Sequence, residues 1–115
     1  MEYVDIWKYR RALTKFRVSC HNLEIEKGRY EGVLLENRIC KYCENNGVIV
    51  IEDEYHFLLH CPLYASIRNK YIELHRPTFE LFMSIMSSED KNTIVNLSKY
   101  IFHGKQIREN FLCSV

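Results

Sequence analysis

The sequence predicts a single, mostly α-helical domain that carries one small β-hairpin. Two observations predict the helices: glycine and proline are scarce, with four and two among 115 residues, and apolar residues repeat near the α-helical period over several stretches. One observation predicts the hairpin: Asn46-Gly47, a strong tight-turn pair, precedes the β-branched run VIVI at residues 48–51. A hydrophobic fraction of 47% in 115 residues suits one small folded domain.

The N-terminal helix is predicted over residues 2–19, with basic residues on its outer face. Its inner stripe consists of Tyr3, Ile6, Trp7, the aliphatic stem of Arg10, Leu13 and Phe16. Residues 21–38 begin as a short amphipathic helix that is predicted to break at Gly28 and Gly32. The chain then reaches the predicted hairpin as a loop or a short strand.

Behind the hairpin, Asp53 is predicted to cap a helix that Pro62 ends, because a residue before proline is pushed out of helical geometry. Helices are also predicted over residues 63–74, stopped by Pro77, and over residues 78–86. A last helix follows Ser88. Its inner face consists of Ile94, Leu97, Ile101 and Ile107. We expect one domain over residues 1–115, in three parts: a basic helical part (1–37), the cysteine segment with the helices after it (38–75), and the C-terminal helices (76–115).

The net charge of +1 conceals an uneven distribution of charge along the chain. Residues 8–41 hold nine Lys or Arg and four Glu, whereas residues 44–54 hold four acidic residues and no basic one. A surface rich in Lys and Arg can bind phosphates, and an ordinary solvated helix face can have the same composition. The basic N-terminal third is therefore compatible with a nucleic-acid partner without requiring one.

Three of the five cysteines and two of the five histidines lie between residues 40 and 61. Cys40 and Cys43 have the spacing of a zinc knuckle, and His56 and Cys61 follow after a loop. The chain has no signal peptide and no apolar run near 18 residues, so we expect an intracellular protein, in the nucleus or the cytoplasm. An odd number of clustered cysteines in a reducing compartment predicts a structural Zn²⁺ site rather than disulfides.

The fourth ligand can be drawn from two residues. His60 shares a helix face with His56, four residues earlier, whereas Cys61 would diverge from His56 by about 140° on a regular helix. Pro62 forces Cys61 out of helical geometry and can turn it back toward the metal. The thiolate preference of structural zinc favours Cys61, with His60 either supporting a ligand from behind or exposed nearby.

Other uses of these cysteines are less favoured. A redox pair is disfavoured because no predicted helix begins at Cys40, and plain core packing does not explain the downstream His56 and Cys61. A catalytic zinc is disfavoured because Phe57 stands where a metalloprotease helix requires glutamate, and four protein ligands leave no position for water. No other catalytic motif stands out, so we expect no enzyme activity.

The segments RRALTKFRVSCHNLEIEKGRY, ENRICKYC and IEDEYHFLLHCPLYASIRNKYI resemble the zinc-binding C-terminal region of reverse transcriptases from non-LTR (LINE-type) retrotransposons. The resemblance covers roughly residues 8–102 and is most specific over residues 38–68. The family's motifs fall on Arg38, Cys40, Cys43, His56, Phe57, Leu58, Cys61 and Pro62. This resemblance implies Cys40, Cys43, His56 and Cys61 as the zinc ligands.

The resemblance also implies a function: a non-catalytic module that helps to position template RNA or target DNA for reverse transcription, with little sequence specificity. Its partners would be RNA or DNA and the rest of a reverse transcriptase, with no membrane or small-molecule substrate. Basic residues would contact phosphates, and tyrosines such as Tyr30 could stack on unpaired bases. The expected contacts are Arg10, Arg11, Lys15, Arg17, Arg29, Arg38, Lys41 and Tyr42. The alternative is a structural zinc domain that binds another protein or packs on the polymerase.

Overall fold

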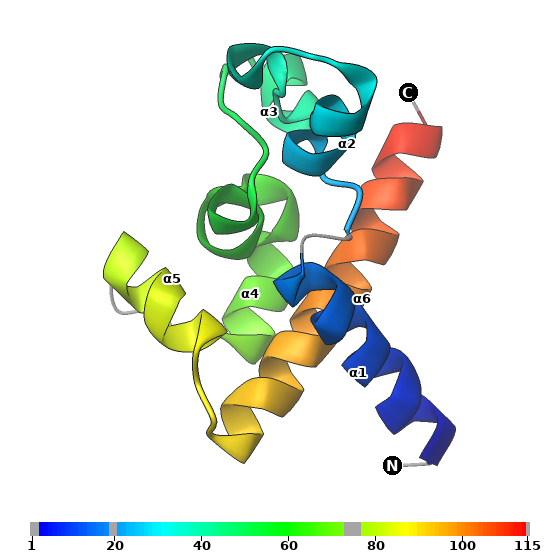
Figure 1. Ribbon diagram of the computed structural model, residues 1–115, viewed down its shortest axis with the longest axis vertical. Helices are drawn as coiled ribbons and strands as arrows, with labels where there is room; N and C mark the ends of the chain where they lie inside the picture. Colours follow the sequence, from blue (N-terminus) through cyan, green and yellow to red (C-terminus); the bar gives the residue numbers. More distant parts are fainter. Residues whose placement is uncertain (1–2, 19–20, 73–76, 115) are drawn as a thin grey trace.

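The computed structural model describes the backbone of residues 3–18, 21–72 and 77–114, and the side chains of these ranges from residue 8 onward. Helices dominate this part of the chain, and it contains no β-strand (Figure 1). The elements are α1 (Tyr3–Arg17), α2 (Glu24–Glu31), η1 (Leu35–Asn37), α3 (Lys41–Asn45), η2 (His56–His60), η3 (Pro62–Tyr64), α4 (Ala65–Tyr71), α5 (Phe79–Met86) and α6 (Lys91–Cys113). Of these, η1 and η3 are single 3₁₀ turns, and η2 is one turn of π-helix.

The long helix α6 is the scaffold of the fold. It packs against α1, α4 and η3, and α1 crosses it in Figure 1, while α2 and α3 lie toward its C-terminal end. Asp90 caps its start by accepting the backbone N–H of Thr93 at 3.0 Å. The predicted inner face of this helix is confirmed, since Leu97 and Ile101 are buried. Burial of that face holds α6 against the other elements.

Aromatic rings fill the centre of the core. The ring of Phe57 lies 5.6 Å from that of Phe16, 4.6 Å from that of Tyr64 and 5.5 Å from that of Tyr100, centroid to centroid. Gly104 allows this packing, because a Cβ at that position would lie 2.7 Å from Cζ of Phe57. The absence of a side chain on α6 thus lets the turn that carries Phe57 approach the helix closely.

A buried arginine connects α4 to the end of η2. The Arg68 guanidinium donates hydrogen bonds to the carbonyl oxygens of Leu58 at 2.9 Å and Cys61 at 2.8 Å, and to the Tyr100 hydroxyl at 3.2 Å. Carbonyls at a helix end have no intrahelical partner. Arg68 therefore satisfies the backbone of η2 inside the core.

The N-terminal helix is confirmed as α1, and Leu13 and Phe16 of its predicted inner stripe are buried. The side chains of Tyr3, Ile6 and Trp7 lie outside the described residues. The predicted helices over residues 63–74 and 78–86 are found as η3 with α4 and as α5. The former ends at Tyr71 instead of at the predicted residue 74, because Ile72 already adopts an extended conformation.

The predicted break at Gly28 is wrong, because α2 continues through it to a left-handed residue, Gly32, with φ 71°. The side chain of Arg38 explains why glycine occupies position 28: a Cβ there would lie 2.5 Å from Cγ of Arg38. The Arg38 guanidinium donates to the carbonyls of Val33 at 3.0 Å and Ile25 at 3.1 Å. Gly28 thus provides room for a side chain, not a helix end.

The predicted β-hairpin is reduced to one antiparallel bridge, between Ile39 and Ile51, with no strand at residues 48–51. The N–H of Cys40 donates to the carbonyl of Val50 at 2.9 Å. Pairing stops there because the chain after Cys40 turns into α3 instead of extending. The predicted turn is found: Gly47 adopts a positive φ of 82°.

Candidate metal centre

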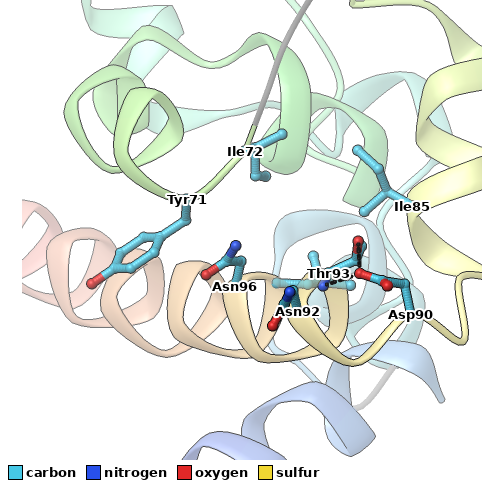
Figure 2. A pocket seen from close by; sticks show the side chains of 8 residues that line it. Tyr71, Ile72, Ile85, Asp90, Asn92, Thr93 and Asn96 are labelled. Carbon is cyan, nitrogen blue, oxygen red and sulfur yellow. Dashed lines mark hydrogen bonds between the residues drawn. The ribbon is translucent and has the colours of Figure 1, made fainter.

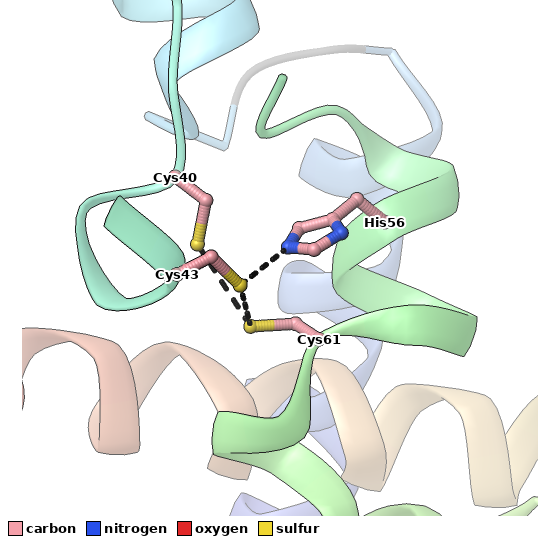
Figure 3. A group of neighbouring side chains, drawn as sticks. All are labelled: Cys40, Cys43, His56 and Cys61. Carbon is pink, nitrogen blue, oxygen red and sulfur yellow. Dashed lines mark hydrogen bonds between the residues drawn. The ribbon is translucent and has the colours of Figure 1, made fainter. Parts of the chain in front are cut away.

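The four residues predicted to bind zinc come together between α3 and η2 (Figure 3). Cys40 lies at the N-cap of α3 and Cys43 lies within that helix, while His56 begins η2 and Cys61 follows its end. All four side chains are buried, and their ligand atoms lie within 4.8 Å of one another. The fold therefore gathers three sulfurs and one imidazole nitrogen around a common point.

The distances in this cluster fit a tetrahedral ion. Sγ of Cys61 lies 3.8 Å from Sγ of Cys40 and 3.9 Å from Sγ of Cys43, and Sγ of Cys43 lies 3.5 Å from Nε2 of His56. Zinc bonds of about 2.3 Å to sulfur and about 2.0 Å to nitrogen place sulfur pairs about 3.8 Å apart and a sulfur–nitrogen pair about 3.5 Å apart. A disulfide has sulfurs about 2.05 Å apart. The cluster could bind a metal ion, and its donor set is compatible with zinc.

The π-helical turn η2 brings His56 and Cys61 together. The N–H of Cys61 donates to the carbonyl of His56 at 2.8 Å, so this turn closes over five residues and stacks the two residues that an α-helix would separate. Cys61 itself is extended, with φ −66° and ψ 124°, as expected of the residue before Pro62. The predicted effect of the proline is confirmed; the π-helical turn was not predicted.

The π-helical turn is held at its start by a cap and along its inner side by the core. The Asp53 carboxylate accepts the backbone N–H of His56 at 2.8 Å, which confirms Asp53 as a cap. Behind it, Phe57 and Leu58 are 1% and 0% exposed. Cap and core together orient the His56 imidazole toward the cysteines.

His60 is the alternative ligand. The Cys/His cluster found in the described part of the chain does not include it. Its side chain is exposed, and its ring lies 4.6 Å from the ring of Tyr55, centroid to centroid. The π-helical turn that brings Cys61 toward His56 leaves His60 on the surface. The choice between the two ligands thus falls on Cys61.

The three thiols differ in how readily they ionise. The hydrogen bond with Cys61 lowers the pKa of Cys40 to about 4, and the same bond raises the pKa of Cys61, which keeps the shared proton. Burial raises the pKa of Cys43. The backbone N–H of Leu63 bonds to the Cys61 sulfur and opposes that rise. One thiolate is stable in this pocket, whereas three require a cation at the centre.

One argument against a redox pair is wrong, because Cys40 does lie at the start of a helix, α3. A second observation keeps the metal interpretation. Cys40 shares its pocket with His56 and Cys61 as well as Cys43, whereas a two-cysteine redox site has no use for two further ligands.

An ion-pair cluster ties the loop before η2, at Glu52, to α2 and α6. Arg108 on α6 donates to both carboxylate oxygens of Glu52, at 3.0 and 2.8 Å, and lies 3.3 Å from the Glu24 carboxylate. Glu52 also accepts the backbone N–H of Glu24 at 2.7 Å. A bidentate arginine pair of this kind holds loop, α2 and α6 in register.

Three acids of the segment over residues 44–54 have partners within the protein. Glu52 binds Arg108 and Asp53 caps η2, as described above. Oε1 of Glu54 lies 2.9 Å from Nε2 of His21. Because Nδ1 of His21 accepts the N–H of Leu23, the hydrogen toward Glu54 belongs to Nε2. Three of the four carboxylates in this segment are thus already engaged within the protein.

The basic residues predicted on α1 are exposed but occupy two flanks of the helix. Arg11 and Lys15, four apart, line a groove between α1 and α6. Arg10 and Arg17, seven apart, share another flank, about 140° and 160° around the helix from Lys15 and about 100° and 120° from Arg11. The expected single basic face is therefore divided.

The other predicted nucleic-acid contacts differ in their surroundings. Arg29 and Lys41 are exposed, and the Arg29 guanidinium lies 5.6 Å from the ring centroid of Tyr30, which is 75% exposed. The Arg38 guanidinium bonds to backbone carbonyls beside α2. The ring of Tyr42 packs edge-on against that of Phe111 on α6, at 5.4 Å. The side chains of Arg38 and Tyr42 are thus already engaged in contacts that stabilise the fold.

A separate pocket of about 310 Å³ lies between α4, α5 and the start of α6 (Figure 2). Ile72 and Ile85 form its apolar side, and Asn92 and Asn96 its polar side. It contains neither a cysteine nor a histidine. Among the described residues, the Cys/His cluster is therefore the stronger candidate for a functional site.

No known protein family, curated protein or solved structure matches this chain. Within the described residues, no helix is long and apolar enough to cross a membrane. The function therefore has to be inferred from the Cys/His cluster and from the charged surfaces of the molecule.

Proposed function

We propose that this protein is a zinc-stabilised nucleic-acid-binding module, similar to the C-terminal region of non-LTR reverse transcriptases. It helps to position template RNA or target DNA for reverse transcription and is not itself catalytic. It acts inside the cell, in the nucleus or the cytoplasm, where thiols stay reduced. The observation that carries this proposal is the buried cluster of Cys40, Cys43, His56 and Cys61.

The zinc is structural. Three thiolates and the Nε2 atom of His56 complete a tetrahedron, so no position is open for a water or substrate. All four ligands are buried among core residues. Zinc binding and folding of residues 38–64 are therefore one equilibrium.

The partner is RNA or DNA, bound mainly through its phosphates. Arg10, Arg11, Lys15 and Arg17 are exposed on α1, and Lys and Arg neutralise phosphates with release of counterions. Because such contacts follow the backbone, little base specificity is expected.

Metal content tests the first half of the proposal. Elemental analysis of protein purified without chelator should give about one zinc per chain. Cys43→Ser and His56→Ala should lose it, since each removes a ligand atom of the cluster. His60→Ala is the matched control: it removes an exposed imidazole four residues away and should keep the metal. A folded wild-type protein without metal contradicts the proposal.

Filter binding to single-stranded RNA across a salt series tests the second half. With roughly four phosphate contacts, the affinity should fall with a log–log slope of about −3, or roughly 60-fold between 50 and 200 mM salt. The complete absence of binding at low salt would rule out the nucleic-acid role.

A structural zinc domain that binds another protein, or packs on the polymerase, is the alternative. The exposed apolar side chains of Val48 (54%) and Ile49 (67%) beside the metal-binding turn favour it. That protein would contain zinc and bind no RNA. The two measurements together separate the two functions.

A further inference from the structure

We infer that single-stranded nucleic acid binds in the groove between α1 and α6, not on the metal-binding turn. This inference rests on the proposed function and specifies where the phosphates lie. The groove has a volume of about 540 Å³. Its charged lining residues are Lys8, Arg11 and Lys15 of α1 and Lys105 and Glu109 of α6. Among the described residues of this lining, four cations therefore face one carboxylate, in a chain whose net charge is only +1.

The cations form a row along one flank of α1. Lys8, Arg11 and Lys15 are spaced by three and four residues, which places them on the same side of the helix. At 1.5 Å per residue the row is about 10 Å long. A row of this length suits a chain of phosphates better than a single small anion. Lys105 faces it from α6, so the groove presents charge from both walls.

Aromatic rings lie between these charges. The rings of Tyr9 and Phe102 meet edge to face at 5.3 Å, and Nζ of Lys8 lies 4.9 Å from the centroid of Phe102. Nζ of Lys99 lies 6.0 Å from the centroid of Tyr9 and extends the basic surface along α6. Cations interleaved with partly exposed rings are typical of surfaces that bind single strands, where bases stack and phosphates pair.

The metal-binding turn is electrostatically less suited to the same ligand. One divalent cation and three thiolates leave one net negative charge there, and Glu44 of α3 is exposed beside Cys43. Of the turn's three predicted contacts, Arg38 and Tyr42 are engaged in hydrogen bonds and ring packing, and Lys41 is exposed. Phosphates would therefore meet a more favourable potential in the groove.

Charge reversal inside and outside the groove tests this placement. The groove variant is Arg11→Glu/Lys15→Glu, and the control is Lys27→Glu/Lys91→Glu, which makes the same change in charge at exposed positions outside the groove and outside the expected contacts. Binding is measured by fluorescence anisotropy with single-stranded RNA and DNA of one sequence, at low salt. The groove variant should bind at least about tenfold more weakly, with a salt slope less steep by about 1.4. The control should change affinity by less than about threefold.

The outcomes separate the two proposals. Wild-type protein that binds neither RNA nor DNA overturns the proposed function itself. Wild-type protein that binds, with the control variant weakened as much as the groove variant or more, overturns the groove and leaves the function standing. The RNA and DNA arms distinguish the two sources of the same phosphate backbone, because only RNA offers a 2′-hydroxyl.

A milder variant guards against loss of structure. Zinc content and thermal unfolding are compared for every variant. Should the groove variant fail to fold, Lys105→Gln decides, because it removes one charge of the opposite wall without introducing an acid. It should weaken binding several-fold with unchanged zinc content. An unchanged affinity for both nucleic acids contradicts the groove.

Discussion

The metal-binding region, residues 38–64, and the pair formed by α1 and α6 close the interior by different means. The helical pair buries apolar and aromatic side chains, such as Leu13, Phe16 and Tyr100, against each other and against Phe57. The metal-binding region consists of a five-residue helix, one turn of π-helix and a single β-bridge. Elements this short are not stable through propensity alone. A metal bound at the Cys/His cluster would therefore stabilise this irregular part most.

Polar contacts nevertheless join the two regions. Arg108 of α6 binds Glu52 in the metal-binding region, and Tyr100 of α6 donates to the carbonyl of Phe57 in η2. Arg68 of α4 donates to the carbonyl oxygen of Cys61, and the sulfur of Cys61 is one of the predicted metal ligands. Loss of the metal would therefore act first on residues 38–64 and reach α6 only through these contacts.

Removal of the metal should have the largest effect on the difference in stability between residues 38–64 and α6. We expect a chelator to abolish hydrogen-exchange protection across residues 38–64, while the core of α6 near Leu97 and Ile101 keeps most of its protection. Structural zinc contributes on the order of 10 kcal/mol to folding of its own site. Hydrogen exchange measured residue by residue, with and without chelator, checks this.

The matched control for that experiment is Cys113→Ser. Cys113 is exposed at the end of α6 and lies outside the cluster, so its loss should leave zinc content and exchange unchanged. Equal loss of protection in α6 and in residues 38–64 would mean that the two regions fold as one unit.

Cutting the ion pair between the regions should have the next largest effect. Arg108→Met leaves the buried Glu52 carboxylate without its bidentate partner, and we expect a loss of about 3 kcal/mol in the free energy of unfolding. Urea denaturation of the zinc-loaded protein measures it. Adding Glu52→Gln should recover part of the loss, because the unpaired buried charge is then gone. A double variant as unstable as the sum of the single variants would show that the pair is not coupled.

A pair of tyrosine variants should give the smallest effect. The Tyr100 hydroxyl accepts from Arg68 and donates to Phe57, so Tyr100→Phe should cost about 1 to 2 kcal/mol. Among the described residues, the Tyr64 hydroxyl is buried without a hydrogen-bond partner. Tyr64→Phe should therefore leave stability unchanged or raise it by less than about 1 kcal/mol. Thermal unfolding of both variants shows which one loses more stability. A larger loss of stability for Tyr64→Phe than for Tyr100→Phe would contradict the prediction.

Much of the candidate site could be predicted because it follows from local spacing. The separation of Cys40 from Cys43 allows one turn to present two sulfurs, and Pro62 dictates an extended Cys61. The π-helical turn could not be predicted in this way. It depends on the anchoring of Phe57 in the core and of the Cys61 carbonyl on Arg68, contacts made with distant parts of the chain.

Other features escaped prediction for the same reason. Gly28 resembles a helix breaker until Arg38 is seen to lie across it. The β-branched residues 48–51 favour a strand, yet the opposite arm turns into α3 and leaves one bridge. The basic residues of α1 look like one surface in the sequence, but packing of the helix on α6 divides them between two flanks.

By itself, the sequence determined the helical character of the protein, the approximate places of its longer helices and the residues able to hold a metal, because these follow from residue type and from neighbours a few positions away. Only the tertiary structure decided that Cys61 rather than His60 joins the cluster, and that Lys105 faces Arg11 across a groove. The physical reason is the same in both cases. Each depends on which side of an element is buried, and burial is set by segments far away in the chain.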